Sequence, residues 1–177
     1  MTLTVTPTLD DIYTKLGNFL ESVLPAGVPV IQLPVNRASM PPSDPGFVGM
    51  TARVQQRIMT NLDRWNPADV APTELAIEQA VQLAVQLDCY GAAAGDWAVI
   101  LSTVLRDEYS MPALAPILAP LYCDDPKFAP LVQGEEQYET RWIVPAYLQY
   151  NPVTSVPAQF ANAAEAALIN VDVSYPP

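Results

Sequence analysis

The sequence lacks histidine entirely and has few basic residues. It holds 8 lysines and arginines against 19 aspartates and glutamates, which gives a formal net charge of -11. Without histidine the chain lacks the commonest general base, the usual zinc ligand and any Ser-His or Cys-His pair. No run rich in lysine or arginine occurs, so the composition disfavours a specific nucleic-acid reader. An acidic surface beside DNA stays compatible with a role in repelling it.

Cysteines, phosphate-binding loops and long apolar runs are also scarce. Cys89 and Cys123 are the only cysteines and form no CxxC pair, so we expect ordinary thiols in a reducing compartment. Neither GxGxxG nor GxxxxGK[ST] occurs. The first residues lack the basic and apolar regions of a secretory signal, and no apolar run approaches the length of a membrane span. We therefore expect a soluble protein with no membrane partner.

Apolar residues, in contrast, are abundant. The 177 residues are 50% hydrophobic and 15% charged, whereas an average soluble domain is about 25% charged. The length predicts a single domain over 1–177 with one well-filled core. A chain with so few charges often hides part of its apolar surface in a partner, so assembly with other chains is a reasonable hypothesis.

The clearest predicted element is a helix over about 8–24. Its apolar residues recur at helical spacing and form one stripe. Thr8 and Asp11 have the spacing of a capping box, and Pro25 and Gly27 end the helix.

Further elements follow from the period of the apolar residues. A second helix is predicted from the stripe that begins at Trp97 and runs to about Glu108, and a short last helix around 160–167. After the second helix, three prolines predict irregular or extended chain. Strands are predicted at 28–33 on a sheet edge, over 47–62 with a bulge or break near Gln56, over 81–89, and over 135–149, where Pro145 indicates an edge or bulge.

These elements predict an α+β fold, mostly antiparallel β-sheet with the two main helices packed on one face. A long loop is expected at 36–46, and a turn region around Asn66-Pro67 and Ala71-Pro72. The last part of the chain, about 151–177, is expected to form an extended C-terminal arm that is free to add to a neighbouring chain.

Candidate chemical groups are few. Asp124 with Asp125, and Glu135 with Glu136, are adjacent acids, which cannot straddle a glycosidase cleft and most often form a solvated turn. Cys89 has no cationic neighbour that would activate a nucleophile. We therefore expect no catalytic, cofactor-binding or metal-binding residue, and Trp97 is expected to belong to the core. The aromatic residues that could suggest base stacking are better explained by core and interface packing: Tyr138, Trp142, Tyr147 and Tyr150.

Several segments together resemble a known family. They are Leu87-Asp-Cys-Tyr-Gly91, Asp96-Trp97, Leu105-Arg-Asp-Glu-Tyr109, Ala119-Pro-Leu-Tyr-Cys-Asp-Asp-Pro126, Glu136-Gln-Tyr-Glu-Thr-Arg-Trp142, Leu148-Gln-Tyr-Asn-Pro152 and the closing Asn170-Val-Asp with Tyr175-Pro-Pro. The set is similar to small proteins of tailed phages and prophages described as phage neck or tail-terminator proteins. The likeness runs from the first helix to the final Pro-Pro.

The resemblance implies a structural role in the virion, assembled in the host cytoplasm. Tail terminators are α+β subunits that close into a ring, typically a hexamer, on the last ring of the tail tube, where they end tube growth and provide the surface for head docking. The implied partners are other copies of the chain, the tail tube protein, a head-completion or adaptor protein and, in contractile tails, the sheath protein. DNA would pass through the lumen without sequence-specific binding, with some acids lining it.

Other functions fit the sequence less well. A neighbouring virion part, either a head-tail connector or a tail tube protein, is the nearest alternative. From a different class, a small acidic binding module would bind a basic protein as a monomer. An enzyme is the weakest hypothesis because the chain has no histidine.

Overall fold

A computed structural model of the chain describes residues 3–33, 41–42, 44–66, 74–133 and 137–157. Within these ranges the helices are α1 (Leu9–Val23), α2 (Ala94–Arg106) and α3 (Ser110–Leu114). The strands are β1 (Thr4–Thr6), β2 (Val30–Gln32), β3 (Phe47–Arg57), β4 (Leu62–Asn66), β5 (Glu74–Glu78), β6 (Val81–Tyr90), β7 (Ala119–Cys123), β8 (Lys127–Phe128), β9 (Leu131–Gln133), β10 (Gln137–Glu139), β11 (Arg141–Tyr150) and β12 (Val153–Pro157). The α+β prediction is confirmed.

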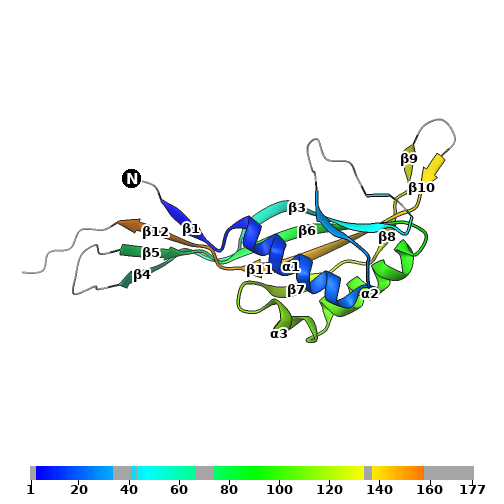
Figure 1. The fold of residues 1–177 in the computed structure, drawn as a ribbon. Helices are drawn as coiled ribbons and strands as arrows, with labels where there is room; N and C mark the ends of the chain where they lie inside the picture. Colours follow the sequence, from blue (N-terminus) through cyan, green and yellow to red (C-terminus); the bar gives the residue numbers. More distant parts are fainter. Residues whose placement is uncertain (1–2, 34–40, 43, 67–73, 134–136, 158–177) are drawn as a thin grey trace, which may run out of the picture.

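The larger sheet, which we call the body sheet, has the order β2-β3-β6-β11-β7, with β8 also paired to β11. Its strands are antiparallel except for the parallel edge pair of β2 and β3. The edge position predicted for 28–33 is thus confirmed. α1 and α2 lie on one face of this sheet, as predicted (Figure 1).

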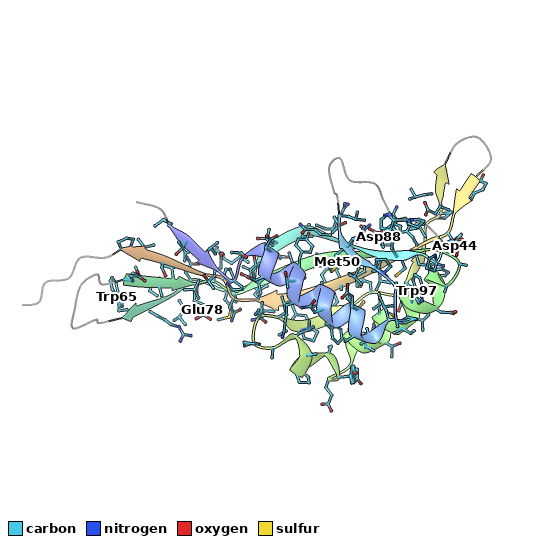
Figure 2. The ribbon with its side chains drawn as sticks, in the orientation of Figure 1. Asp44, Met50, Trp65, Glu78, Asp88 and Trp97 are labelled. Atoms are coloured by element: carbon cyan, nitrogen blue, oxygen red, sulfur yellow. The ribbon has the colours of Figure 1, made fainter. Side chains whose placement is uncertain are left out.

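The core lies between the body sheet and the helices. The predicted alternation in β6 is confirmed, because Val81, Leu83, Val85, Leu87 and Cys89 are each 5% exposed or less. Trp97, labelled in Figure 2, is also a core residue, as expected. The facing helical side chains are Ile12, Leu16, Phe19 and Leu20 of α1 and Trp97, Ala98, Leu101 and Leu105 of α2.

The predicted start of α1 is confirmed in detail. The backbone N–H of Asp11 donates to the Thr8 hydroxyl at 3.2 Å, and the Thr8 backbone N–H donates to the Asp11 carboxylate at 2.8 Å. This reciprocal pair satisfies two backbone donors that the first turn leaves without helical partners. α1 therefore begins where the capping residues predict.

A second sheet extends from one end of the body (Figure 1). This extension sheet has the order β1-β12-β5-β4. Three of its strands continue strands of the body after short interruptions: β4 follows β3, β5 precedes β6, and β12 follows β11. Backbone hydrogen bonds cross the junction from Ile58 N to Ala80 O at 3.0 Å and from Gln79 N to Pro152 O at 3.0 Å.

Several local predictions need correction. The strand predicted over 47–62 ends at Arg57, close to the predicted break, but its bulge lies between Ala52 and Val54. The second helix ends at Arg106, two residues before the predicted end. The predicted irregular chain after it contains α3, because Pro112 falls in the first helical turn, where a missing N–H breaks no hydrogen bond.

The predicted strand over 135–149 is divided at Thr140. Its first part is β10, which pairs with β9 in a small two-stranded sheet that was not predicted. Its second part, β11, lies inside the body sheet, so of the edge or bulge predicted from Pro145 the edge is wrong, and a register shift against β7 lies nearby, between Tyr147 and Leu148. Pro145 O accepts a hydrogen bond from Asp124 N at 2.9 Å, so the proline nitrogen also faces the segment between β7 and β8. This segment leaves the ladder there, so the missing N–H of the proline breaks no strand pairing.

Other predictions lie wholly or largely outside the described residues. They are the loop at 36–46, the turns that follow Asn66, the last helix around 160–167 and most of the C-terminal arm. The first residues of that arm form β12, which pairs with β1 and β5 of the same chain.

Candidate assembly surfaces

One face of the extension sheet is apolar. Cross-strand register places Trp65 opposite Leu75, Ile77 opposite Thr154, and Thr154 opposite Val5, so these side chains share one face. The same register adds Val156 and Asp63 to it. We call this set the apolar face of the extension. Trp65 is 55% exposed and Val5 is 47% exposed.

The opposite face of the extension carries a charged pair and several other polar residues, together with Leu62, Ala76 and Val153. Arg64 and Glu78 form an ion pair of 2.8 Å between Nη2 and Oε2, and Asn151 also donates to Glu78. Thr4, Ser155 and Glu74 lie on this same face by register. The alternation of apolar and polar residues is typical of an antiparallel sheet with one covered face and one solvated face.

The apolar face lies on the helical side of the molecule. A depression of about 370 Å³ at the junction is lined by Ile77 and Thr154 of the extension together with Val81 of the body sheet and Leu9 of α1. The face that the helices cover in the body therefore continues into the extension, where no described helix covers it.

The other side of the body sheet carries no described helix and is covered at only one end. At that end Phe47, Asp88 and Tyr90 are buried, and Leu33 packs over Gly49 so closely that a Cβ at Gly49 would lie 2.2 Å from its Cδ1. At the other end a depression of about 300 Å³ is open to solvent. We call this second end the open face of the body, and its lining includes Arg53, Val54, Gln56, Gln82, Ala84, Gln86, Pro145 and Tyr147.

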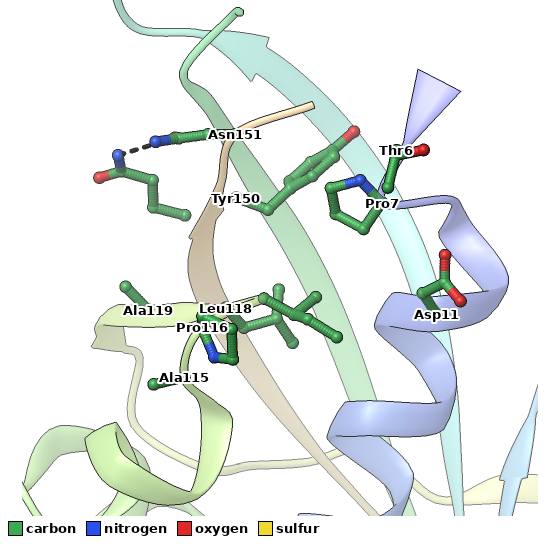
Figure 3. Close-up of a pocket in the computed structure, with 11 residues that line it drawn as sticks. Thr6, Pro7, Asp11, Ala115, Pro116, Leu118, Ala119, Tyr150 and Asn151 are labelled. Atoms are coloured by element: carbon green, nitrogen blue, oxygen red, sulfur yellow. Dashed lines mark hydrogen bonds between the residues drawn. The ribbon is translucent and has the colours of Figure 1, made fainter. Parts of the chain in front are cut away.

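A third hollow of about 560 Å³ lies beside the start of α1 (Figure 3). Pro116 and Leu118 line one side, and Pro7 and Tyr150 line the other. Its one charged lining residue, Asp11, has a lowered pKa because it accepts hydrogen bonds from the Thr8 side chain and backbone. Asp11 is therefore an ionised helix cap and not a proton donor.

The adjacent acids Asp124 and Asp125, in the β7–β8 turn, each bind a neighbouring side chain. Asp125 forms an ion pair with Arg106, with 2.7 Å between Oδ1 and Nη2. Asp124 accepts a hydrogen bond from the Tyr147 hydroxyl at 3.3 Å. The two carboxylates thus bind separate partners and do not converge on one point. Glu135 and Glu136 lie outside the described residues.

The aromatic residues of 138–150 do not form one stacking platform. Trp142 packs against Phe128, with ring centroids 5.4 Å apart, and Tyr150 is buried with its hydroxyl bound to Gln55. Tyr147 stacks on Tyr122 at the open face, and Tyr138 is 75% exposed on β10. Because the four side chains lie in different places, they do not offer a continuous platform for successive bases.

The two cysteines are buried and free. Burial, with a smaller contribution from Asp88, raises the pKa of Cys89 to about 12. Burial also raises the pKa of Cys123 to about 11, although the nearby Arg106 opposes the shift. Both therefore stay protonated near neutral pH and lack the thiolate that nucleophilic or metal-binding chemistry needs.

A buried ion pair on the covered end of the body sheet was not predicted. Asp88 is 2% exposed, and its Oδ1 lies 2.7 Å from Nη2 and 3.0 Å from Nε of Arg141. Gln86 also donates to Asp88, and Arg141 lies over the Tyr90 ring at 5.7 Å. Alternation in β6 places Asp88 on the face that appeared solvated, and only the cover from distant segments buries it.

The described residues hold no group of three potential metal ligands among histidine, cysteine, aspartate and glutamate. No described helix is long and apolar enough to cross a membrane.

The model of a family described as phage neck terminator protein matches residues 10–172. A comparison with curated proteins found no match.

Proposed function

The chain belongs to the phage neck terminator proteins, and from this membership we propose that its copies close into a ring that caps the tail tube.

 The ring would be formed by copies of this chain, typically six, in a neck that is part of the virion. The observation that carries the proposal is the family match, which spans nearly the whole chain.

The ring would end tube growth and offer the surface on which the head docks. Its partners would be the tail tube protein on one side, a head-completion or adaptor protein on the other and, in a contractile tail, the sheath protein. The apolar face of the extension, which no described helix covers, and the open face of the body support this proposal, because assembly proteins need surfaces that other chains cover. A single domain over 1–177 would supply all of these contacts.

The lumen of the ring would carry DNA without gripping it. The formal net charge of -11 supports this part of the proposal, since a surface rich in carboxylates repels phosphates and offers few cations to bind them. Some of the acids would line the lumen.

Electron microscopy of intact particles tests the proposed place of the chain. We expect density for its copies at the head-to-tail junction, and particles without such density would contradict the proposal. Removing the gene should give tubes of uncontrolled length that carry no heads, because nothing would end their growth. A purified chain that polymerises into long tubes by itself would instead identify a tail tube protein.

The mass of the purified assembly gives a simpler test. A ring of six would weigh about 115 kDa, which is six times the 19.2 kDa of one chain, and mass photometry separates it from a monomer. A complex of one copy with a basic protein would instead favour a small acidic binding module.

A further inference from the structure

The extension sheet is built like a sheet with one covered face. Most of its large apolar side chains share one face and its charged pair lies on the other, beside Leu62 and Val153, yet no residue of β1, β4, β5 or β12 whose exposure is described is fully buried. Antiparallel sheets with this alternation normally pack their apolar face against another layer. Among the described residues no such layer covers the apolar face of the extension.

Charge limits what that occupant can be if it is a second copy. Two chains that each carry a formal charge of -11 repel one another unless they meet through surfaces with few acids. The apolar face of the extension carries a single charged side chain, Asp63, by register. Its neighbours there are apolar or uncharged, so the face satisfies this condition.

The open face of the body is the complementary surface. Among the described residues that line it, Arg53 is the one charged side chain, and the rest are glutamines, small apolar residues, Pro145 and Tyr147. Asp124 lies beside it, where it accepts the hydrogen bond of Tyr147. An acidic group on one surface and a basic group on the other set a register that contact between two identical apolar faces would lack.

We propose that the apolar face of the extension docks on the open face of the body in a second copy of this chain, with Asp63 against Arg53. The contact joins two different surfaces, so it is heterologous and can repeat around a closed ring. Stacking of two apolar faces would instead make a closed dimer and place two Asp63 carboxylates in one interface. The inference rests on the proposed ring and names the surfaces that close it.

Charge reversal tests the contact. We expect Asp63→Arg and Arg53→Asp each to weaken self-association of the full-length chain by at least about tenfold, because each puts like charges together. An equimolar mixture of the two variants should assemble like the wild type, since every junction in an alternating ring then joins opposite charges. Sedimentation velocity over a concentration series measures both effects.

Matched controls separate this contact from a change in net charge. Glu74→Arg makes the same change on the opposite face of the extension, and Lys15→Asp makes it on α1, outside the lining of the open face. Neither control should weaken assembly as the test variants do. Thermal unfolding of all four variants confirms that each chain is folded before assembly is compared.

Three outcomes would overturn the inference. In the first, Arg53→Asp has no effect while mixing Asp63→Arg with wild type restores assembly, which would show that two apolar faces meet. In the second, the wild-type chain stays monomeric at every concentration. In the third, hydrogen exchange in β4 and β5 is equally slow in the monomer and the assembly, which would show that the chain covers its own apolar face. The place of the protein in the virion, tested by microscopy, does not depend on any of them.

Discussion

Three strands of the extension sheet continue strands of the body sheet, but the two sheets differ in what covers them. In β6, Leu83, Val85 and Leu87 are each 2% exposed or less beneath the helices. In β5, which directly precedes β6, Leu75 and Ile77 point to the same side but remain partly exposed. The pattern of apolar residues is the same in both strands, and only the covering layer differs.

Alternation of apolar and polar residues along a strand indicates a face that will be buried, but it does not indicate which chain covers that face. In the body, α1 and α2 of the same chain supply the cover. In the extension, no described helix does so. We infer that most of the monomer's stability resides in the body, and that the extension contributes mainly to contacts between chains.

Two matched leucine truncations test this difference most directly. We expect Leu87→Ala to lower the free energy of unfolding by about 3 to 4 kcal/mol, because it leaves a cavity in a filled core. Leu75→Ala should cost less than about 1 kcal/mol in the monomer, because its side chain already contacts solvent. Urea unfolding at low protein concentration measures both effects. Equal losses in the free energy of unfolding would show that the extension is covered in the monomer.

The buried ion pair tests the covered end of the body sheet. Arg141→Met should lower the free energy of unfolding by about 3 kcal/mol, because it leaves the Asp88 carboxylate buried with Gln86 as its one side-chain donor among the described residues. Asp88→Asn should cost less, since the Arg141 side chain is 20% exposed and water can solvate it. Urea unfolding of the two variants in parallel gives the order, and the reverse order would show that solvent reaches Asp88.

The pH dependence of stability tests the burial of Cys89 in the core of the body, and we expect the smallest of the three effects here. Burial raises the pKa of Cys89 to about 12, from an ordinary value of 9.0, so the folded state holds a proton that the unfolded state loses. This contribution to stability is complete below pH 9.0 and declines as pH rises towards 12, by about 1.4 kcal/mol per pH unit. Unfolding measured between pH 8 and 11 should show a shallower decline for Cys89→Ala, whatever its stability at neutral pH, and identical slopes would show that the thiol is not buried.

Local features of the fold could be predicted from the sequence because they depend on neighbouring residues. The capping box of Thr8 and Asp11, the stripe of α1 and the period-two pattern of β6 are all set within one element. These features gave the correct fold class and the correct covered face of β6.

Features that depend on distant segments could not be predicted in this way. Asp88 falls on the polar side of its strand, and its burial depends on Leu33 and Arg141, which are remote in sequence. The interior position of Pro145 depends on the gap between β7 and β8. The division into body and extension depends on interruptions at equivalent places in three strands that pair only after folding.

The candidate assembly surfaces could not be predicted from the sequence either, because they depend on how the strands pair. Trp65 and Leu75 lie opposite one another only because β4 and β5 pair, and Arg53 lines the open face only because of the bulge in β3. The sequence indicated that spare apolar surface exists, but the register decides where it gathers.

The triple continuity of strands between the two sheets has a mechanical consequence. A projection attached by one strand could swivel about that strand, whereas one attached by three side-by-side strands, with Ile58 and Gln79 bonded across the junction, resists twisting. A load on the tip is therefore transmitted along β3, β6 and β11 to the side chains beneath α1 and α2. The protein would behave as a stiff lever, so that the displacement of one bound neighbour would be transmitted to the core of the adjoining subunit.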